Sequence, residues 1–198
     1  WRDQVKSILL VYLGGQAVGH ASVALLTGQV SPSGKLPETW PLTLADTPAV
    51  NHFGDRAATQ YRESIFAGYR WYDTARREVA YPFGHGLSYT DFQYENLVLT
   101  VLTDQVKVDL QVTNTGQVAG SEVVQLYVSP INSQVYRAEK ELKGFEKIHL
   151  LPGETKQVQF TLSQRAFSYY DVGLKNWNVE PLSYRISVGG SSRDLRLS

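Results

Sequence analysis

The sequence predicts an α/β fragment followed by an all-β region, and three observations support that prediction. A nearly continuous apolar run near the start is followed by glycines and then by small apolar residues at helical spacing. Beyond residue 92, apolar and polar residues alternate with a period of two, as in half-buried strands. Turn residues separate these stretches, and no helical pattern lies between them. We therefore expect a partial α/β sandwich over residues 1–80, a junction over 81–92 and an antiparallel two-sheet β-sandwich over 93–198.

The first expected element is a strand over Val5–Leu13, because an unbroken apolar run is typical of a strand covered on both faces. Gly14 and Gly15 end this strand. Small apolar residues then recur at helical spacing, namely Ala17, Ala21, Ala24 and Leu25. Gly28 follows where a helix end favours a residue that tolerates positive φ. The glycine pair fits no phosphate-loop pattern, so we expect close backbone packing there.

An aromatic stretch, YRESIFAGYRWYD at residues 61–73, follows a polar surface loop expected over residues 45–60. Bulky apolar side chains favour an extended conformation there, namely Ile65, Phe66, Tyr69, Trp71 and Tyr72. We expect the arginines among them to stack on the rings or to pair with the neighbouring carboxylates: Arg62, Arg70, Glu63 and Asp73. A sugar-binding platform is an alternative use of these rings, but a strand that packs its aromatics into the core is commoner.

The region after residue 92 contains the alternating strands of the expected sandwich. Apolar residues spaced by two mark four of them: Val106, Val108, Leu110 and Val112, then Val124, Leu126 and Val128, then Val158, Phe160 and Leu162, and finally Tyr184, Ile186 and Val188. The LPGE sequence at residues 151–154 predicts a turn, with proline followed by glycine. About seven short strands without an intervening helix predict two packed antiparallel sheets.

The junction, YPFGHGLSYTDF, combines flexible and bulky residues. Gly84 and Gly86 relax the limits on the backbone, while Pro82 and the aromatic rings favour rigid packing. His85 has the chemistry for acid–base work or metal binding, but no acidic or nucleophilic partner lies close to it in the sequence. We therefore expect a histidine held by backbone hydrogen bonds rather than a base or a ligand.

Composition excludes several classes of partner. The formal net charge is +0 and no basic run occurs, so we expect neither nucleic acid nor a membrane surface as a partner. No apolar run reaches the roughly 20 residues needed to span a bilayer. The chain contains no cysteine, so it has no disulfide. It also contains no methionine, and we therefore expect it to be a piece of a longer protein. Its first residues form no secretory signal, but for a piece this does not indicate a cellular compartment.

No sequence pattern assigns a catalytic or metal site. The four histidines form neither H-x-x-x-H nor H-E-x-x-H: His20, His52, His85 and His149. No serine lies in G-x-S-x-G. The acidic residues are scattered, among them Glu38, Glu63, Asp73, Glu78, Asp91 and Glu122. We therefore expect no catalytic residue, no metal ligand and no cofactor in this chain, and we assign no substrate-binding residue.

Six stretches occur in one order along almost the whole chain. They are GGQAVGHASVALLTGQVSPSGKLPETWP, YRESIFAGYRWYD, YPFGHGLSYTDFQY, VTNTGQVAGSEVVQLYV, ELKGFEKIHLLPGE and SVGGSSRDLRL. The first three resemble the C-terminal part of glycoside hydrolase family 3, the β-glucosidase-type enzymes, and the last three resemble that family's fibronectin type III-like domain. The resemblance implies that residues 1–80 end the α/β sandwich domain and that residues 93–198 form a fibronectin type III-like β-sandwich.

The resemblance also implies a parent that is a retaining β-glycosidase, with two carboxyl groups on either side of the scissile O-glycosyl bond. In that family a barrel domain carries the nucleophilic aspartate, and the acid/base glutamate commonly lies earlier in the α/β domain. Neither motif has a counterpart here, so the chain alone is expected to be inactive and to partner the missing N-terminal portion, which binds a small saccharide. Three positions depart from the family pattern and could tie the loops differently: Ala17, Val18 and Ser31.

An alternative from a different class is an independent carbohydrate- or protein-binding β-sandwich module. Aromatic residues motivate it: Tyr69, Trp71, Tyr72 and Trp177. A separate expectation concerns the front of the chain, because a single strand–helix unit exposes an apolar face and an open strand edge. We expect self-association, association with the missing portion, or poor order over residues 1–60.

Overall fold

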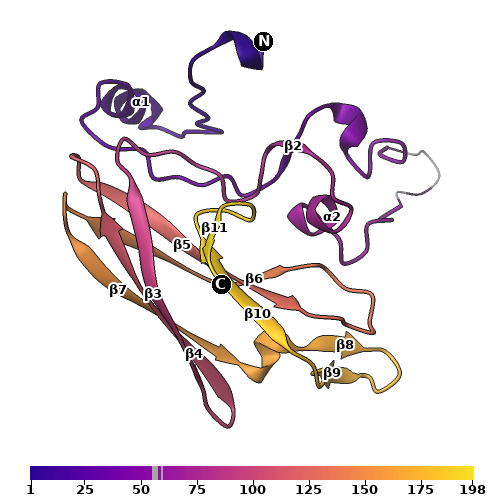
Figure 1. The fold of residues 1–198 in the computed structure, drawn as a ribbon. Coiled ribbons are helices and arrows are strands. Elements are labelled where there is room, and N and C mark those ends of the chain that lie inside the picture. Colours follow the sequence, from indigo (N-terminus) through magenta and orange to yellow (C-terminus); the bar gives the residue numbers. More distant parts are fainter. Residues whose placement is uncertain (55–57, 59) are drawn as a thin grey trace.

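The computed structural model describes residues 1–54, 58 and 60–198. Figure 1 shows a β-sandwich with the N-terminal segments lying along one side, helix α1 toward one end and helix α2 toward the other. The helices are α1 (Val18–Leu26) and α2 (Tyr69–Thr74), with 3-10 turns at Arg2–Gln4, Leu44–Asp46 and Gln164–Phe167. The strands are β1 (Trp40–Pro41), β2 (Val79–Tyr81), β3 (Phe92–Val101), β4 (Gln105–Asn114), β5 (Gly120–Pro130), β6 (Glu141–Leu150), β7 (Thr155–Ser163), β8 (Tyr169–Asp171), β9 (Asn176–Asn178), β10 (Tyr184–Gly189) and β11 (Leu195–Leu197).

Seven of these strands form the sandwich. One sheet has the order β11-β10-β5-β6 and the other the order β3-β4-β7, and all neighbours pair antiparallel. The small sheets β1-β2 and β8-β9 lie outside them. The expected fold class, an α/β fragment followed by an antiparallel β-sandwich, is confirmed.

The core of the sandwich contains most of the residues that the period-two pattern identified; Val106 and Tyr184 are only partly buried against it, and Tyr94, Ile148 and Leu150 join it as well. Val108 lies beside Phe160 in the β4–β7 register, and Leu110 lies beside Val158. The opposite sheet contributes Val124, Leu126, Val128, Ile186 and Val188, and all of these side chains are buried in one cluster. Truncating one such side chain to alanine costs about 2–5 kcal/mol, so this cluster makes the sandwich stable.

The helix expected before Gly28 and the turn expected at residues 151–154 are both present. Helix α1 ends as expected, and Gly28 after it has a φ of 74°. In the LPGE turn, the Glu154 N–H donates to the Leu151 carbonyl at 2.9 Å. Gly153 there has a φ of 75°, which a type II turn requires at its third position.

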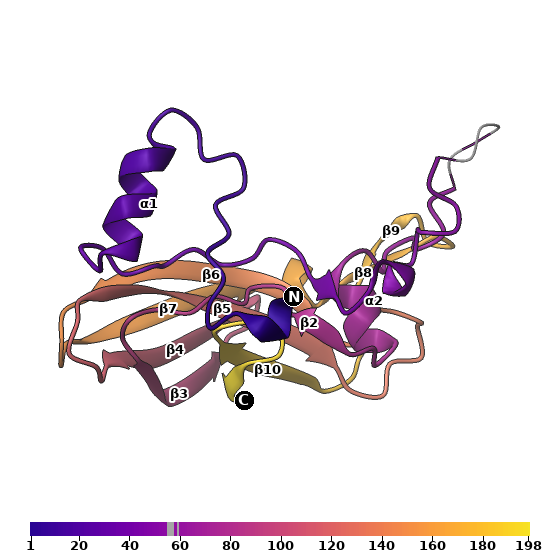
Figure 2. The ribbon, with the colours of Figure 1, turned by 90° about the horizontal axis from the view of Figure 1, so that it is seen from above.

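The apolar run Val5–Leu13 does not form the expected strand. It lies outside every helix and strand of the described residues, and its apolar side chains are exposed, from 37% at Leu10 to 100% at Leu13. A strand needs a neighbour for its backbone N–H and C=O groups, and no described segment of this chain supplies one. Helix α1 also buries no residue and stands away from the sandwich (Figure 2).

The extended conformation expected across residues 61–73 is wrong for Tyr69–Thr74, which is helical. Gly68, with a φ of 59°, turns the chain before the helix, and its carbonyl accepts the Trp71 N–H at 3.0 Å. Tyr69, Tyr72 and Asp73 share one buried helix face because residues three and four apart align. Tertiary packing therefore overrides the preference of aromatic residues for strands.

The polar loop expected over residues 45–60 is described in part. It starts within the 3-10 turn at Leu44–Asp46, where Thr43 and Asp46 form a capping box. Turns continue to residue 54, and the rest of this expectation, at residues 55–57 and 59, lies outside the described residues.

Candidate functional site

The junction is hydrogen-bonded to the front part and to the sandwich. Toward the front, the Gly84 N–H donates to the Leu36 carbonyl and the Leu36 N–H donates to the His85 carbonyl, each at 2.8 Å. Toward the sandwich, the Ser192 N–H donates to the Phe83 carbonyl at 2.9 Å. These main-chain bonds hold three distant segments of the chain together.

Gly84 lets the junction approach strand β5 closely at Gln125. The φ of Gly84 is 81°, and a Cβ added there would overlap the Gln125 side-chain amide. Gln125 is buried and donates from Nε2 to the carbonyls of Gly84 at 3.3 Å and Gly190 at 2.6 Å. Its Oε1 accepts the Tyr127 hydroxyl at 2.7 Å. One buried amide therefore joins the junction, strand β5 and the segment after β10.

Lys35 links the front part to the sandwich through a buried ion pair. Its Nζ lies 2.9 Å from Glu122 Oε1, and the two side chains are 14% and 4% exposed. The same Nζ donates to the Gly86 carbonyl at 3.0 Å. The SGK sequence at residues 33–35 is therefore part of a structural contact.

The three positions that depart from the family pattern lie around α1 and the junction. Ala17 precedes α1 without a side-chain cap, and Val18 is its first residue. Ser31 Oγ lies 2.8 Å from Ser88 Oγ and accepts the Tyr89 N–H at 3.1 Å. The serine thus ties the segment after α1 to the junction.

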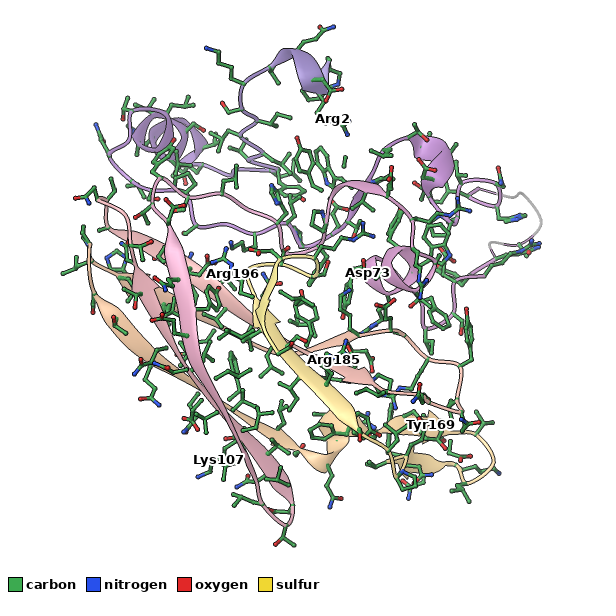
Figure 3. All side chains as sticks on the ribbon, viewed as in Figure 1. Arg2, Asp73, Lys107, Tyr169, Arg185 and Arg196 are labelled. Atoms are coloured by element: carbon green, nitrogen blue, oxygen red, sulfur yellow. The ribbon has the colours of Figure 1, made fainter. Side chains whose placement is uncertain are left out.

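A second charged cluster surrounds Asp73, which lies between α2 and the sandwich (Figure 3). Its carboxylate lies 3.0 Å from Lys140 Nζ and 2.8 Å from Arg193 Nε, and its side chain is 5% exposed. Arg193 also donates to the Arg77 carbonyl at 2.7 Å. The cluster holds α2 against the segments before β6 and β11.

The arginine pairs expected within residues 61–73 are not formed. Arg70 Nε lies 3.7 Å from Glu141 Oε1 of strand β6, and the Arg62 Nε donates to Gln60. The stacking alternative is confirmed for Arg70, whose guanidinium carbon lies 5.7 Å from the centre of the Tyr69 ring.

The histidines lie apart from one another. The main-chain N–H of His85 donates to the Pro82 carbonyl at 3.1 Å, and its ring lies 5.2 Å from that of Tyr81. Burial, reinforced by the charge of Lys35, lowers the pKa of His85 and favours the neutral imidazole. Of the other three, His20 lies in α1, His52 in a turn of the loop after β1, and His149 Nδ1 lies 3.1 Å from Ser121 Oγ on the surface.

The scattered carboxylates also occupy separate environments. Glu38 accepts the Tyr12 hydroxyl at 3.0 Å on an exposed surface. The buried Asp73 and Glu122 are both ion-paired. Each of these two carboxylates is therefore engaged in a structural contact between segments of the chain. Glu63, Glu78 and Asp91 are not part of either buried cluster.

The four aromatic residues that suggested a binding module do not share one surface. Tyr69 and Tyr72 are buried, as the core interpretation expected, and Trp71 packs edge-on against Tyr72 at 4.8 Å. Trp177 lies on β9 and is 48% exposed. Ile65, from the same stretch, is 55% exposed.

A groove of about 640 Å³ opens between α2, the segment before β6 and the β8–β9 hairpin. Its rim carries the rings of Tyr136, Tyr169, Tyr170 and Trp177 and the cationic groups of Arg70, Arg137, Lys143 and Arg165. Among its described lining residues, Glu141 alone is a carboxylate. Burial alone would raise the pKa of Glu141, but Lys143, Arg70 and Arg137 outweigh burial and lower it.

The described residues contain neither a cluster of metal-ligating side chains nor a membrane-spanning helix. None of their histidine, aspartate and glutamate side chains gather in threes that could hold a metal ion. None of their helices is long and apolar enough to cross a membrane.

Sequence patterns did not indicate the residues that join the front part, the junction and the sandwich. Gln125 and Tyr127 lie in VVQLYV, which is buried on both faces of β5. An apolar run that interrupts a period-two pattern indicates that both faces of the strand are covered, and this signal could have located the contact. The groove had no such signal, because its cations come from four separate segments.

Comparison with known proteins agrees with this architecture. Residues 1–89 match the glycosyl hydrolase family 3 C-terminal domain, and residues 122–192 match the fibronectin type III-like domain. The chain belongs to glycoside hydrolase family 3. It corresponds to the C-terminal part of such a protein, as the six stretches indicated.

Individual relatives cover the chain almost completely. The chain is 50% identical to the thermostable beta-glucosidase B of Acetivibrio thermocellus over 100% of its length, and 43% identical to an exo-alpha-(1->6)-L-arabinopyranosidase of Bifidobacterium longum over 98%. The crystal structure of a GH3 beta-glucosidase from Bifidobacterium adolescentis superposes with a TM-score of 0.95 at 41% identity, over 99% of the chain. The chain spans only 27%, 26% and 29% of these three proteins, respectively.

Proposed function

We propose that the chain is the non-catalytic C-terminal part of a retaining β-glycosidase of the β-glucosidase type, which hydrolyses O-glycosyl bonds. The observation that carries the proposal is a match over the full length of this chain to only part of a β-glucosidase. All of the chain aligns with the Acetivibrio thermocellus relative, but it spans 27% of that protein's length. The catalytic aspartate and glutamate belong to the portion that precedes this segment in the family. The ion-paired state of Asp73 and Glu122 supports the absence of a catalytic pair here.

The proposed partner is that N-terminal portion, the barrel and the rest of the α/β domain. Its docking surface on this chain is the exposed run Val5–Leu13 together with α1, which buries no residue. A further strand laid beside Val5–Leu13 would satisfy its backbone groups and cover its apolar side chains. Without that partner, we expect the surface to drive self-association.

The proposed substrate of the assembled enzyme is a small saccharide, bound mainly by the N-terminal portion. Relatives of this segment are named both beta-glucosidase and exo-alpha-(1->6)-L-arabinopyranosidase. Similar C-terminal parts therefore accompany enzymes whose names give different sugars, which supports placing glycone selection outside this chain.

We also propose a division of the chain into an α/β segment (1–80), a junction (81–92) and a sandwich (93–198). Hydrogen exchange tests this division, because separate units would show amide protection in separate cooperative groups.

Two measurements test the proposal. A chromogenic β-glucoside assay on the isolated chain is expected to give no turnover above a heat-killed control, and clear turnover would remove the claim that the chain lacks the catalytic pair. Size-exclusion chromatography is expected to show association beyond the monomer, or fast amide exchange across Val5–Leu13. A monomer fully protected in that run would contradict the proposed docking surface.

A further inference from the structure

We propose that the groove between α2, the segment before β6 and the β8–β9 hairpin binds an acidic saccharide, a sugar that carries a carboxylate. This site goes beyond the proposed function, because it lies between α2 and the sandwich and needs no catalytic group. The groove volume of about 640 Å³ suits one or two sugar rings, since ligand pockets commonly measure 300–1,000 Å³.

The groove has more positive than negative charge. Glu141 lies 3.3 Å from Arg137, 3.2 Å from Lys143 and 3.7 Å from Arg70, so one carboxylate neutralises part of three cations. Glu180 lies 3.8 Å from Arg137 and compensates it from the buried side. Arg165 adds a fourth, exposed cation at the groove. These four cations exceed the two carboxylates by two positive charges, and a ligand carboxylate would offset one of them.

The cations around Glu141 are also incompletely hydrogen-bonded. Arg70 Nε is buried and has no hydrogen-bond partner, and its 3.7 Å ion pair is too long for a hydrogen bond. An arginine fork pairs well with two carboxylate oxygens, and such charge-assisted bonds are among the strongest in proteins. The Arg70 side chain as a whole is 37% exposed, so a ligand carboxylate would approach its guanidinium while Arg137 stays paired with Glu141.

Aromatic rings form the apolar wall of the groove. Trp177 and Tyr170, on the paired strands β9 and β8, lie 5.4 Å apart edge to face, and each is about half exposed. The guanidinium of Arg165 lies over the Trp177 ring. Tyr136, 80% exposed, contributes a further ring to the groove. Apolar walls with a few convergent charged groups are typical of small-molecule sites, and a sugar ring presents both C–H faces and polar edges to such a wall.

The test is a calorimetric titration of the 198-residue chain with two matched disaccharides, one ending in glucuronate and the other in glucose. We expect the acidic disaccharide to bind at least about tenfold more tightly at low salt, and this advantage to shrink as salt screens the partly exposed charges. Equal affinities for the two sugars, or no heat from the acidic sugar at millimolar concentration, would overturn the proposal. The isolated chain is sufficient, so this result is independent of whether the chain supports catalysis.

A pair of variants locates the binding. Arg165→Gln removes a groove cation and is expected to weaken binding of the acidic disaccharide by about fivefold, the effect of a partly exposed charge pair. Arg185→Gln removes the same charge from an exposed position on β10 outside the groove lining, and is expected to leave binding unchanged. Unchanged binding in Arg165→Gln, or an equal loss in both variants, would overturn the assignment; thermal melts of both variants check that each is folded.

Discussion

Replacing Gly84 with alanine perturbs the contact that joins the junction to the sandwich. The residue has a φ of 81°, which L side chains adopt at a cost, and an added Cβ would overlap the amide of Gln125. Gln125 would then have to move from the carbonyls of Gly84 and Gly190 and from the Tyr127 hydroxyl. The variant therefore combines backbone strain with the loss of a buried hydrogen-bond network.

The two costs can be estimated separately. A side chain in the left-handed region costs about 1–2 kcal/mol. A buried polar group left without its partner costs about 1–3 kcal/mol. We expect Gly84→Ala to lower the free energy of unfolding by about 2–5 kcal/mol, since both terms act.

The matched control is Gly153→Ala in the LPGE turn. Gly153 has a nearly equal φ of 75°, but nothing lies within 4 Å of its added Cβ. Only the strain of about 1–2 kcal/mol therefore applies. Urea unfolding followed by circular dichroism measures both variants, and hydrogen exchange at the Ser192 N–H, which donates to Phe83, reports whether the junction has detached.

Two results would refute the reasoning. If Gly84→Ala costs no more than Gly153→Ala, the close approach to Gln125 contributes no stability. If exchange at Ser192 stays as slow as in the unmodified chain, the junction remains bound and the predicted detachment does not occur.

Three further predictions concern the charged contacts. Lys35→Met leaves Glu122 buried without its cation and is expected to cost about 3–5 kcal/mol in urea unfolding; adding Glu122→Leu to it should recover most of the loss, and a double variant as unstable as the single one would contradict the pairing. Asp73→Asn leaves two cations without their carboxylate and is expected to lower the thermal midpoint, whereas an unchanged midpoint would show that the cluster does not hold α2. Glu141 has a lowered pKa, so its contribution is present above its ordinary value of 4.5 and is lost as pH falls through the lower folded pKa. Glu141→Gln should therefore flatten the acid limb of a stability–pH curve, and an identical limb would contradict this.

The sandwich could be predicted from the sequence because its strands are half-buried. In β4 and β7 polar and apolar residues alternate, and every apolar position of the pattern from Val108 to Leu162 in these strands is buried. Period-two patterning is a local signal, and the two sheets satisfy it within this chain. The same signal was weaker in β6, where Gly144 and exposed Phe145 interrupt the alternation.

The front part was less predictable because its conformation depends on contacts distant in the sequence. Tyr69 and Tyr72 favour strands intrinsically, yet Gly68 and the packing of α2 on the sandwich make them helical. Val5–Leu13 has the composition of a buried strand but no strand beside it among the described residues. The groove is likewise a product of tertiary structure, since Arg70 and Trp177 meet there only after folding.

Reconstitution of activity tests the central claim most directly. The chain would be co-expressed with the polypeptide encoded upstream of Trp1, and hydrolysis of a chromogenic β-glucoside would be compared for the mixture and for each part alone. We expect turnover only in the mixture, because under the proposed function this chain stabilises the enzyme without contributing the attacking carboxylate or the proton donor. Turnover by the 198-residue chain on its own, at a rate comparable with that of the mixture, would contradict the account.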